Sequence, residues 1–331
     1  MDWLHKAVKP MDVLIAAVGL YVFLFGINYN DMSIIDTAYA VSFGIWGGTV
    51  YRSLLYLLER FKMTKAVFFD IDGTLINIHR GQTSLTEPVK KAIRALRKAG
   101  HHTFIASGRP WAYLAKELTT SGLFDGFVLL NGAVVLLDGK VIFRKDLPLE
   151  VVRAIVKRAE ECGVEYILES NPSVYLKREY KALEEVYTSI DIGLEDFVRD
   201  YDESLAGLQI GKIEFLSETP NAGGLFHELL AWPGLTGLID PTLLKYMELY
   251  SADISKGTGI LEALKYLGIP VEESYAFGDG LNDLEMMDTV GTSLVMGNAG
   301  NELKAKADYV LPSVDEDGVA DGIYRYILKT I

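Results

Sequence analysis

Residues 66–75 read AVFFDIDGTL, a short apolar run that ends in two aspartates and a glycine. The run before Asp70 has the length and composition of a buried β-strand, and Gly73 permits a sharp turn after it. Asp70 and Asp72 are therefore expected at the carboxyl end of a strand, where open α/β sheets bind ligands. One carboxylate there can attack phosphorus while the other transfers protons. Taken alone, the four residues DIDG fit an ordinary acidic turn equally well.

A second segment joins a strand-like run to groups that suit a phosphate. Residues 103–106 read TFIA and lead into Ser107, Gly108 and Arg109. A hydroxyl, a free backbone N–H and a guanidinium in succession can hold a phosphate. By itself, Ser-Gly-Arg is a weak signal.

A lysine opens a helix further along the chain. Ser255 and Lys256 precede an amphipathic pattern whose apolar positions recur at helical spacing through residue 267. At the start of a helix, Lys256 and the helix dipole would both favour an anion. A solvated surface lysine is the alternative.

The last segment is a strand-like run followed by an acidic, glycine-rich loop. Residues 274–277 read SYAF, and residues 278–283 read GDGLND. Asp279 and Asp283 offer carboxylates and Asn282 offers an amide on this loop. Such oxygen donors suit a hard divalent cation.

Together these segments resemble the four motifs of the haloacid dehalogenase (HAD) superfamily, and they are most similar to its Cof-type phosphatases with a type IIB cap. The resemblance covers residues 63–331, with D-x-D-G-T, S-G-R, S-K-G and G-D-G-x-N-D in the family's order and spacing. It implies an α/β fold with a doubly wound, parallel-sheet HAD core formed by residues 63–146 and 248–331. An α+β cap, residues 147–247, would be inserted in this core and would select the substrate.

The resemblance also implies a role for each motif residue. Asp70 would be the nucleophile and a Mg²⁺ ligand, whereas Asp72 would bind Mg²⁺ through its backbone carbonyl and act as general acid and base. Asp279 would be a further carboxylate on the metal, and Asp283 would orient the metal shell. The phosphate-binding residues implied in this way are Ser107, Gly108, Arg109, Lys256 and Asn282.

Electrostatics gives an independent reason to expect the metal. Two carboxylates about 4 Å apart repel by roughly 4 kcal/mol at an effective dielectric constant near 20. Several acids would have to coexist with an incoming phosphate dianion, so a site without a cation would repel its substrate. Mg²⁺ prefers a few carboxylates, several waters and a phosphate oxygen, which matches this set of groups.

These features predict a Mg²⁺-dependent phosphomonoester hydrolase that acts on a small phosphorylated metabolite, a sugar phosphate or a phosphorylated cofactor, through an aspartyl-phosphate. The alternatives are a phosphomutase with the same motifs and a membrane-anchored protein that binds a phosphorylated ligand without turnover. A formal net charge of −13 argues against a nucleic acid as partner. The single cysteine, Cys162, fits a reducing compartment.

Residues 1–62 lie outside this pattern and hold two apolar runs, 13–27 and 37–51. Fifteen residues rise only about 22 Å as a helix, so each run needs flanking residues to cross a membrane. Basic residues lie before the first run and after the second, which predicts a helical hairpin with both ends in the cytoplasm. We therefore expect a cytoplasmic catalytic domain anchored to the inner face of the cell membrane. A hairpin buried in a homo-oligomer or against the enzyme, and a fusion segment, are the alternatives.

The predicted cap carries none of the four motifs. Residues 151–162 fit a helix and residues 209–215 fit a strand. Its candidate substrate contacts are Tyr175, Lys177, Lys212 and Glu214, for each of which an ordinary folded surface is the alternative. Outside the cap, Asp138 and Gly139 are expected at the tip of a hairpin, and His101 and His102 are expected at the surface.

Overall fold

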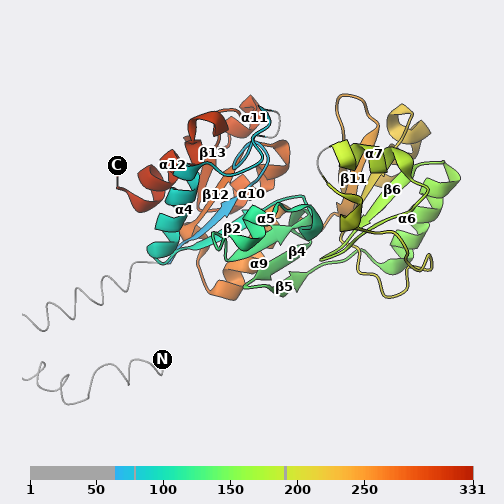
Figure 1. Cartoon of the computed structure of the whole chain (residues 1–331), viewed down its shortest axis with the longest axis horizontal. Helices are drawn as coiled ribbons and strands as arrows, with labels where there is room; N and C mark the ends of the chain where they lie inside the picture. Colours follow the sequence, from blue (N-terminus) through green and yellow to red (C-terminus); the bar gives the residue numbers. More distant parts are fainter. Residues whose placement is uncertain (1–63, 78–79, 190–191, 331) are drawn as a thin grey trace, which may run out of the picture. The chain divides into compact units, whose positions relative to one another are not determined.

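The computed structural model describes residues 64–77, 80–189 and 192–330 (Figure 1). The predicted N-terminal hairpin and membrane anchor, residues 1–62, lie outside the described residues. Within the described ranges, no helix has both the length and the apolar character needed to cross a bilayer.

The first of two sheets has eight strands, and Asp70 directly follows its central strand. Six neighbouring strands run parallel, and the last two are added as antiparallel partners at one edge. In spatial order the strands are β14 (Tyr309–Val310), β13 (Thr292–Val295), β12 (Ser274–Gly278), β1 (Ala66–Phe69), β2 (His102–Ala106), β3 (Gly126–Leu129), β4 (Val134–Leu137) and β5 (Lys140–Arg144).

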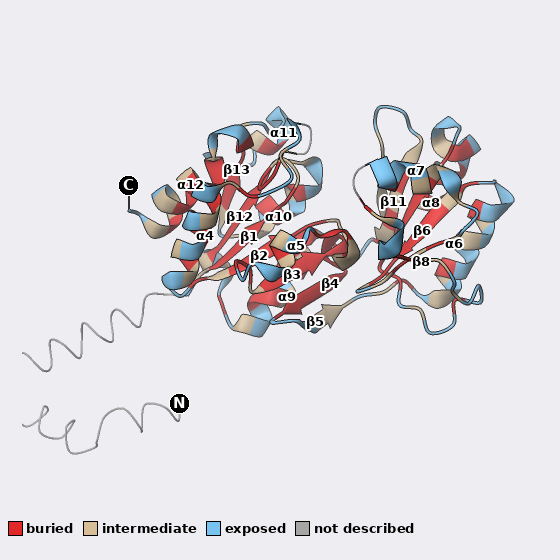
Figure 2. Ribbon diagram, in the orientation of Figure 1, coloured by how far each residue is buried: buried red, intermediate tan, exposed pale blue. Residues whose placement is uncertain are grey.

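Helices cover both faces of this sheet. Successive side chains of a strand point to opposite faces, and in these strands both sets are apolar, so both faces must be covered. Phe69 and its neighbours pack against α4 (Glu87–Lys98) and α12 (Gly318–Gly322), which a π-helical turn, Ile323–Leu328, continues. Phe68 and its neighbours pack against α9 (Lys256–Leu267) and α10 (Leu284–Thr289). Two short helices complete this part, α5 (Lys116–Thr120) and α11 (Asn301–Lys304). The six strands from β13 to β4 are buried along nearly all of their length, whereas the edge strands β5 and β14 are not (Figure 2).

The second sheet has six strands, and the chain enters it after β5. Its strands are antiparallel except for the last neighbouring pair in the order. In spatial order they are β10 (Leu235–Ile239), β11 (Tyr246–Ser251), β9 (Lys212–Leu216), β6 (Glu165–Glu169), β7 (Val174–Leu176) and β8 (Phe197–Val198). α6 (Leu149–Glu161) and α8 (Leu225–Leu230) cover one face, and α7 (Lys181–Ser189) packs on the other.

This arrangement confirms the predicted fold class, a parallel α/β core with an inserted α+β part. Several local predictions are confirmed as well. Ser255 caps α9 through a capping box, and Asp138 and Gly139 form the tip of the β4–β5 hairpin with φ values of 49° and 74°. The start of α4 is capped by Thr86, whose side chain accepts a hydrogen bond from Val89 N.

Two details differ from the expectations. The strand predicted from residue 209 begins at Lys212, because the carbonyl of Ile210 instead accepts a hydrogen bond from Leu147 N. His101 is only 7% exposed rather than at the surface, since its Nδ1 accepts a hydrogen bond from Lys65 N.

Candidate active site

The site lies where β1 and β12 end side by side. The two strands are parallel neighbours with Phe69 in register with Phe277, and Asp70 N donates a hydrogen bond to Phe277 O. The loops that follow both strands therefore leave the sheet at the same edge. This brings together the motif that begins at Asp70 and the motif that contains Asp279.

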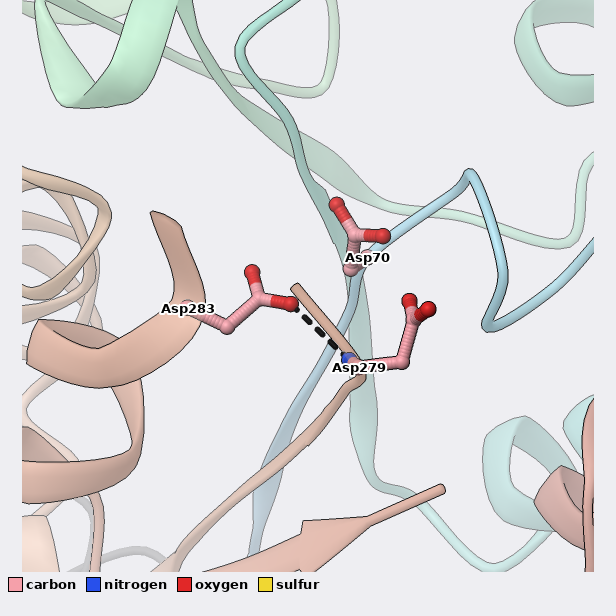
Figure 3. A group of neighbouring side chains, drawn as sticks. All are labelled: Asp70, Asp279 and Asp283. Atoms are coloured by element: carbon pink, nitrogen blue, oxygen red, sulfur yellow. Dashed lines mark hydrogen bonds between the residues drawn. The ribbon is translucent and has the colours of Figure 1, made fainter. Parts of the chain in front are cut away.

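Three carboxylates meet at this edge. Asp70, Asp279 and Asp283 each have an oxygen within 4.8 Å of the other two (Figure 3). Asp283 is fully buried and Asp70 is 7% exposed. The structure thus brings together three of the four acids predicted to bind metal. Hard oxygen donors of this kind fit Mg²⁺, and no histidine or cysteine belongs to this group in the described part of the chain.

Lys256 neutralises part of this charge. Its Nζ lies 2.6 Å from Asp70 Oδ1 and 2.7 Å from Asp283 Oδ1, and its side chain is fully buried. The alternative of a solvated surface lysine is therefore wrong. Because Lys256 occupies Oδ1 of Asp70, the second oxygen of that carboxylate is left for a metal or for attack on phosphorus.

The loop after β12 is held by Asp283 and by two residues that the site prediction missed. Asp283 Oδ2 accepts hydrogen bonds from the backbone N–H groups of Asp279 and Gly280, each 3.0 Å long. Asp279 accepts one hydrogen bond from Thr74 Oγ1 at 3.0 Å and one from Asn298 Nδ2 at 3.1 Å. The signals available in the sequence were the threonine of D-I-D-G-T and the asparagine of M-G-N-A.

The pKa values of two of these acids are raised. Burial and the nearby Asp283 raise the pKa of Asp70 to about 8, although Lys256 opposes the shift. Burial and Asp283 also raise the pKa of Asp279 to about 6. Both shifts mean that the protein alone cannot balance the negative charge of this site, which a divalent cation would do.

Asp72 lies apart from the three carboxylates, in an ion pair with Arg109. Arg109 Nε and Nη2 lie 2.9 Å and 2.7 Å from the two oxygens of Asp72, a bidentate geometry. Arg109 Nη1 also donates to Tyr113 O at 3.2 Å. The Asp72 side chain is thereby fixed in direction, and its carboxylate is not part of the cluster of Asp70, Asp279 and Asp283.

The remaining predicted residues divide between buried and exposed positions. Ser107 is 2% exposed at the end of β2, and its Oγ accepts a hydrogen bond from Arg109 N at 3.2 Å. Gly108 follows it and lies against the amide of Asn131, which leaves no room for a side chain. Asn282 is exposed on the turn Leu281–Asp283, so the structure does not bring it into the buried cluster.

The four candidate contacts of the predicted cap lie on opposite faces of the six-stranded sheet. Tyr175 packs with the residues under α6 and α8, and Lys177 pairs with Glu160 of α6 at 2.8 Å. Lys212 and Glu214 point to the other face, where both are buried. For Tyr175 and Lys177 the alternative of an ordinary folded surface therefore fits better.

Comparison with known proteins identifies the class to which this fold and site belong. Residues 67–323 match the family of haloacid dehalogenase-like hydrolases. The chain belongs to this family and is a phosphatase of the HAD superfamily.

Individual relatives resemble it over most of their length. The putative phosphatase YkrA of Bacillus subtilis is 34% identical, over 78% of this chain and 95% of that protein. The 5-amino-6-(5-phospho-D-ribitylamino)uracil phosphatase YitU of the same organism is 28% identical, over 78% of this chain and 96% of YitU. The structure of the HAD subclass IIB sugar phosphatase BT4131 superimposes with a TM-score of 0.68 at 27% identity, covering 80% of this chain and 99% of that structure.

The raised pKa values predict how stability depends on pH and Mg²⁺. Between pH 4 and 8 the folded state binds more protons at Asp70 than the unfolded state does, so the metal-free protein loses stability as pH rises through this range. Mg²⁺ competes with those protons, and its stabilising effect should therefore grow from pH 5.5 to pH 8.5. We expect saturating Mg²⁺ to raise the melting temperature by about 5 °C at pH 8.5 and by much less at pH 5.5. Differential scanning fluorimetry at constant ionic strength measures this, and an equal shift at both pH values would contradict it.

A second prediction concerns the turn after Asp70. Gly73 has φ +88°, and a Cβ at this position would lie 2.1 Å from Asp279 Oδ2. Gly73→Ala should therefore displace Asp279 and also strain the backbone, at a cost of about 1–3 kcal/mol in the free energy of unfolding. Gly100→Ala is the matched control, because Gly100 has φ +85° but a Cβ there would meet no atom within 4 Å. Chemical denaturation should show a larger loss for Gly73→Ala, with a loss of the Mg²⁺-induced shift in that variant alone.

Proposed function

We propose that this chain is a Mg²⁺-dependent phosphomonoester hydrolase that acts on a small phosphorylated metabolite through an aspartyl-phosphate at Asp70. The observation that carries the proposal is the group of Asp70, Asp279 and Asp283 at the carboxyl ends of β1 and β12, in which the buried Asp70 and Asp283 pair with Lys256. Family membership supports the class of reaction.

The first half of the proposed reaction transfers the phosphoryl group to the protein. An oxygen of Asp70 forms a bond to phosphorus while the ester P–O bond breaks, and Asp72 gives its proton to the departing oxygen. In the structure both oxygens of Asp72 accept from Arg109, so this role requires the pair to open, with the guanidinium of Arg109 turning to the phosphate. Mg²⁺, when bound by Asp70, Asp279 and the backbone carbonyl of Asp72, would offset the charge of the phosphate.

The second half returns the protein to its starting state. Asp72, now ionised, takes a proton from a water molecule whose oxygen attacks phosphorus, and the bond between phosphorus and Asp70 breaks to release inorganic phosphate. Lys256, Ser107, Gly108 and the guanidinium of Arg109 are the proposed partners of the phosphate oxygens. Asn282, which is exposed, would reach the phosphate from the solvent side of the loop. Asp283 is proposed to hold this loop rather than to bind the metal, because its two oxygens are already occupied.

Relatives support a substrate of low molecular mass. The names of two of them specify a sugar phosphatase and a phosphatase of a phosphorylated ribitylamino compound. The test is release of inorganic phosphate from a panel of sugar phosphates and phosphorylated cofactors, with Mg²⁺ and with a chelator. Turnover that requires Mg²⁺ supports the proposal, and its absence over the whole panel would favour a binding protein without turnover. Recovery of the phosphate on another substrate hydroxyl would instead identify a phosphomutase.

Two expectations from the sequence remain proposals. Residues 1–62 are proposed to anchor the chain to the cytoplasmic face of a membrane, on the basis of their apolar runs and flanking charges. Fractionation of cells that express the full chain tests this, since an anchored protein stays in the membrane pellet at high salt. The boundaries of the core and the cap, 63–146, 147–247 and 248–331, are likewise proposed.

A further inference from the structure

A buried polar cluster lies on one face of the six-stranded sheet. It consists of Lys212 and Glu214 of β9, Glu169 of β6 and Glu248 of β11, and we refer to it as the Lys212 cluster. Strand register sets Glu169 opposite Lys212 and Glu248 opposite Glu214, so the four side chains share one face. Lys212 Nζ lies 3.0 Å from Glu169, 2.6 Å from Glu214 and 3.6 Å from Glu248.

Negative charge and hydrogen-bond acceptors are in surplus in this cluster. Three carboxylates surround one ammonium group, and Lys212, Glu169 and Glu214 are each less than 5% exposed. Burial raises the pKa of Glu169 to about 7 and raises that of Glu214 well above its usual value. Tyr187 donates its hydroxyl to Glu214. The single ammonium is shared among all three carboxylates, so it cannot also balance the charge of an anionic ligand.

Two residues of the core bring further unpaired groups to the cluster. Asn131 Nδ2 donates to Glu248 Oε2 at 3.0 Å. The ring of Tyr113 lies 5.1 Å from that of Tyr187, and burial together with Glu169 and Glu214 raises the pKa of its hydroxyl. Among the described residues, Asn131 Oδ1, Tyr113 Oη and Glu169 Oε1 are buried without a hydrogen-bond partner. Buried polar atoms of this kind are costly unless a ligand pairs with them.

The same two residues connect the cluster to the proposed phosphate loop. Asn131 N donates to Ser107 O at 3.3 Å, and Asn131 Oδ1 lies 2.7 Å from the position of a Cβ at Gly108. Tyr113 O accepts the hydrogen bond from Arg109 Nη1. Asn131 and Tyr113 therefore border residues 107–109, where the phosphate is proposed to bind.

We propose that the Lys212 cluster, together with Asn131 and Tyr113, binds the leaving group of the substrate and selects leaving groups that carry hydroxyl groups over anionic ones. This inference rests on the proposed function and specifies its substrate class. A hydroxyl group can donate to Glu248 or Asn131 Oδ1 and can accept from the unpaired hydroxyl of Tyr113, so it pairs with both kinds of group. A carboxylate or second phosphate would face Glu169 and Glu248, which repel it.

Within the cluster, Glu248 has the most accessible side chain, which is 26% exposed. We assign the direct contact with the leaving group to Glu248. Glu169 and Lys212 position the Glu248 side chain and set the local charge. Replacing Glu248 by glutamine keeps the size and the acceptor toward Asn131 but removes the negative charge. The effect should therefore depend on the charge of the ligand.

The test compares two open-chain ligands that differ only at the carbon farthest from the phosphate. Glucitol 6-phosphate ends in a hydroxyl group and 6-phosphogluconate ends in a carboxylate. Their inhibition constants are measured as competitors of p-nitrophenyl phosphate hydrolysis, for the native chain and for Glu248→Gln. The matched control is Glu228→Gln, since Glu228 is a surface carboxylate of α8 that pairs with Arg158 instead.

We expect the native chain to bind glucitol 6-phosphate at least about tenfold more tightly than 6-phosphogluconate, and Glu248→Gln to reduce that ratio about fivefold. Glu228→Gln should leave the ratio unchanged. Equal inhibition constants in the native chain would overturn the inference. A change of both constants by the same factor in Glu248→Gln would overturn it as well, because it would indicate a structural role only.

Failure of the proposed function gives a different result. If p-nitrophenyl phosphate is not hydrolysed in Mg²⁺, the hydrolase proposal fails, and calorimetric titration of the same two ligands still measures the ratio of their dissociation constants. A preference for glucitol 6-phosphate would then support leaving-group selection in a protein without turnover. No preference would refute it independently of catalysis.

Discussion

Asp70→Asn is expected to reduce phosphate release at least about 1,000-fold without unfolding the protein. The amide has nearly the volume of the carboxyl group but cannot act as the nucleophile. Folding should not suffer, because the raised pKa of Asp70 means that its charge is unfavourable in the folded, metal-free state. The melting temperature of the metal-free variant at pH 8 should equal or exceed that of the native chain.

The control for this variant is Asp288→Asn. Asp288 lies on α10 and makes an exposed ion pair with Lys306, so its replacement should leave both activity and melting temperature unchanged. Steady-state phosphate release and circular dichroism measure the two effects. Hydrolysis at a normal rate by a pure Asp70→Asn preparation would rule out the covalent mechanism.

Lys256→Met should have the largest effect on stability. The substitution leaves Asp70 and Asp283 buried without their ammonium partner, and breaking a buried ion pair in this way costs about 3–5 kcal/mol. Loss of the ammonium also raises the pKa of Asp70 further, since Lys256 opposes the present shift. The loss of stability should therefore be greater at pH 8.5 than at pH 5.5, where Asp70 can remain protonated.

Urea denaturation at the two pH values measures this difference. Lys265→Met is the matched control, because Lys265 lies on the same helix with a side chain that is 77% exposed. Replacing it should change the free energy of unfolding by less than about 0.5 kcal/mol. Equal changes in the free energy of unfolding for Lys256→Met and Lys265→Met would show that the buried ion pairs of Lys256 do not stabilise the protein.

The sequence was sufficient to predict where the main acids meet. Asp70 and Asp279 each follow a strand-like apolar run, and parallel strands of an α/β sheet end at a common edge. Their proximity therefore follows from the order of the motifs and from the position of β1 beside β12. Lys256 was placed correctly at the start of a helix, but its complete burial depends on the packing of α9 against the sheet.

Contacts between distant segments could not be predicted in the same way. The pairing of Arg109 with Asp72 depends on how two loops face each other, and neither loop has a periodic pattern. The contact of Asn131 with Glu248 joins residues 117 positions apart. Alternation along β9 shows that Lys212 and Glu214 share a face, but not that Tyr175 and Lys177 point the opposite way. That depends on which side of the sheet α6 and α8 cover.

Direct detection of phosphorylated Asp70 tests the central proposal most directly. p-Nitrophenolate needs no proton to leave, so Asp72→Asn should still form the aspartyl-phosphate from p-nitrophenyl phosphate but hydrolyse it slowly. Acid quenching, borohydride reduction and peptide mass spectrometry would then identify the modified residue, because reduction converts an aspartyl-phosphate to homoserine. We predict homoserine at position 70 when Mg²⁺ is present and none without it. An unmodified Asp70 in a preparation that releases p-nitrophenolate would contradict the proposed mechanism.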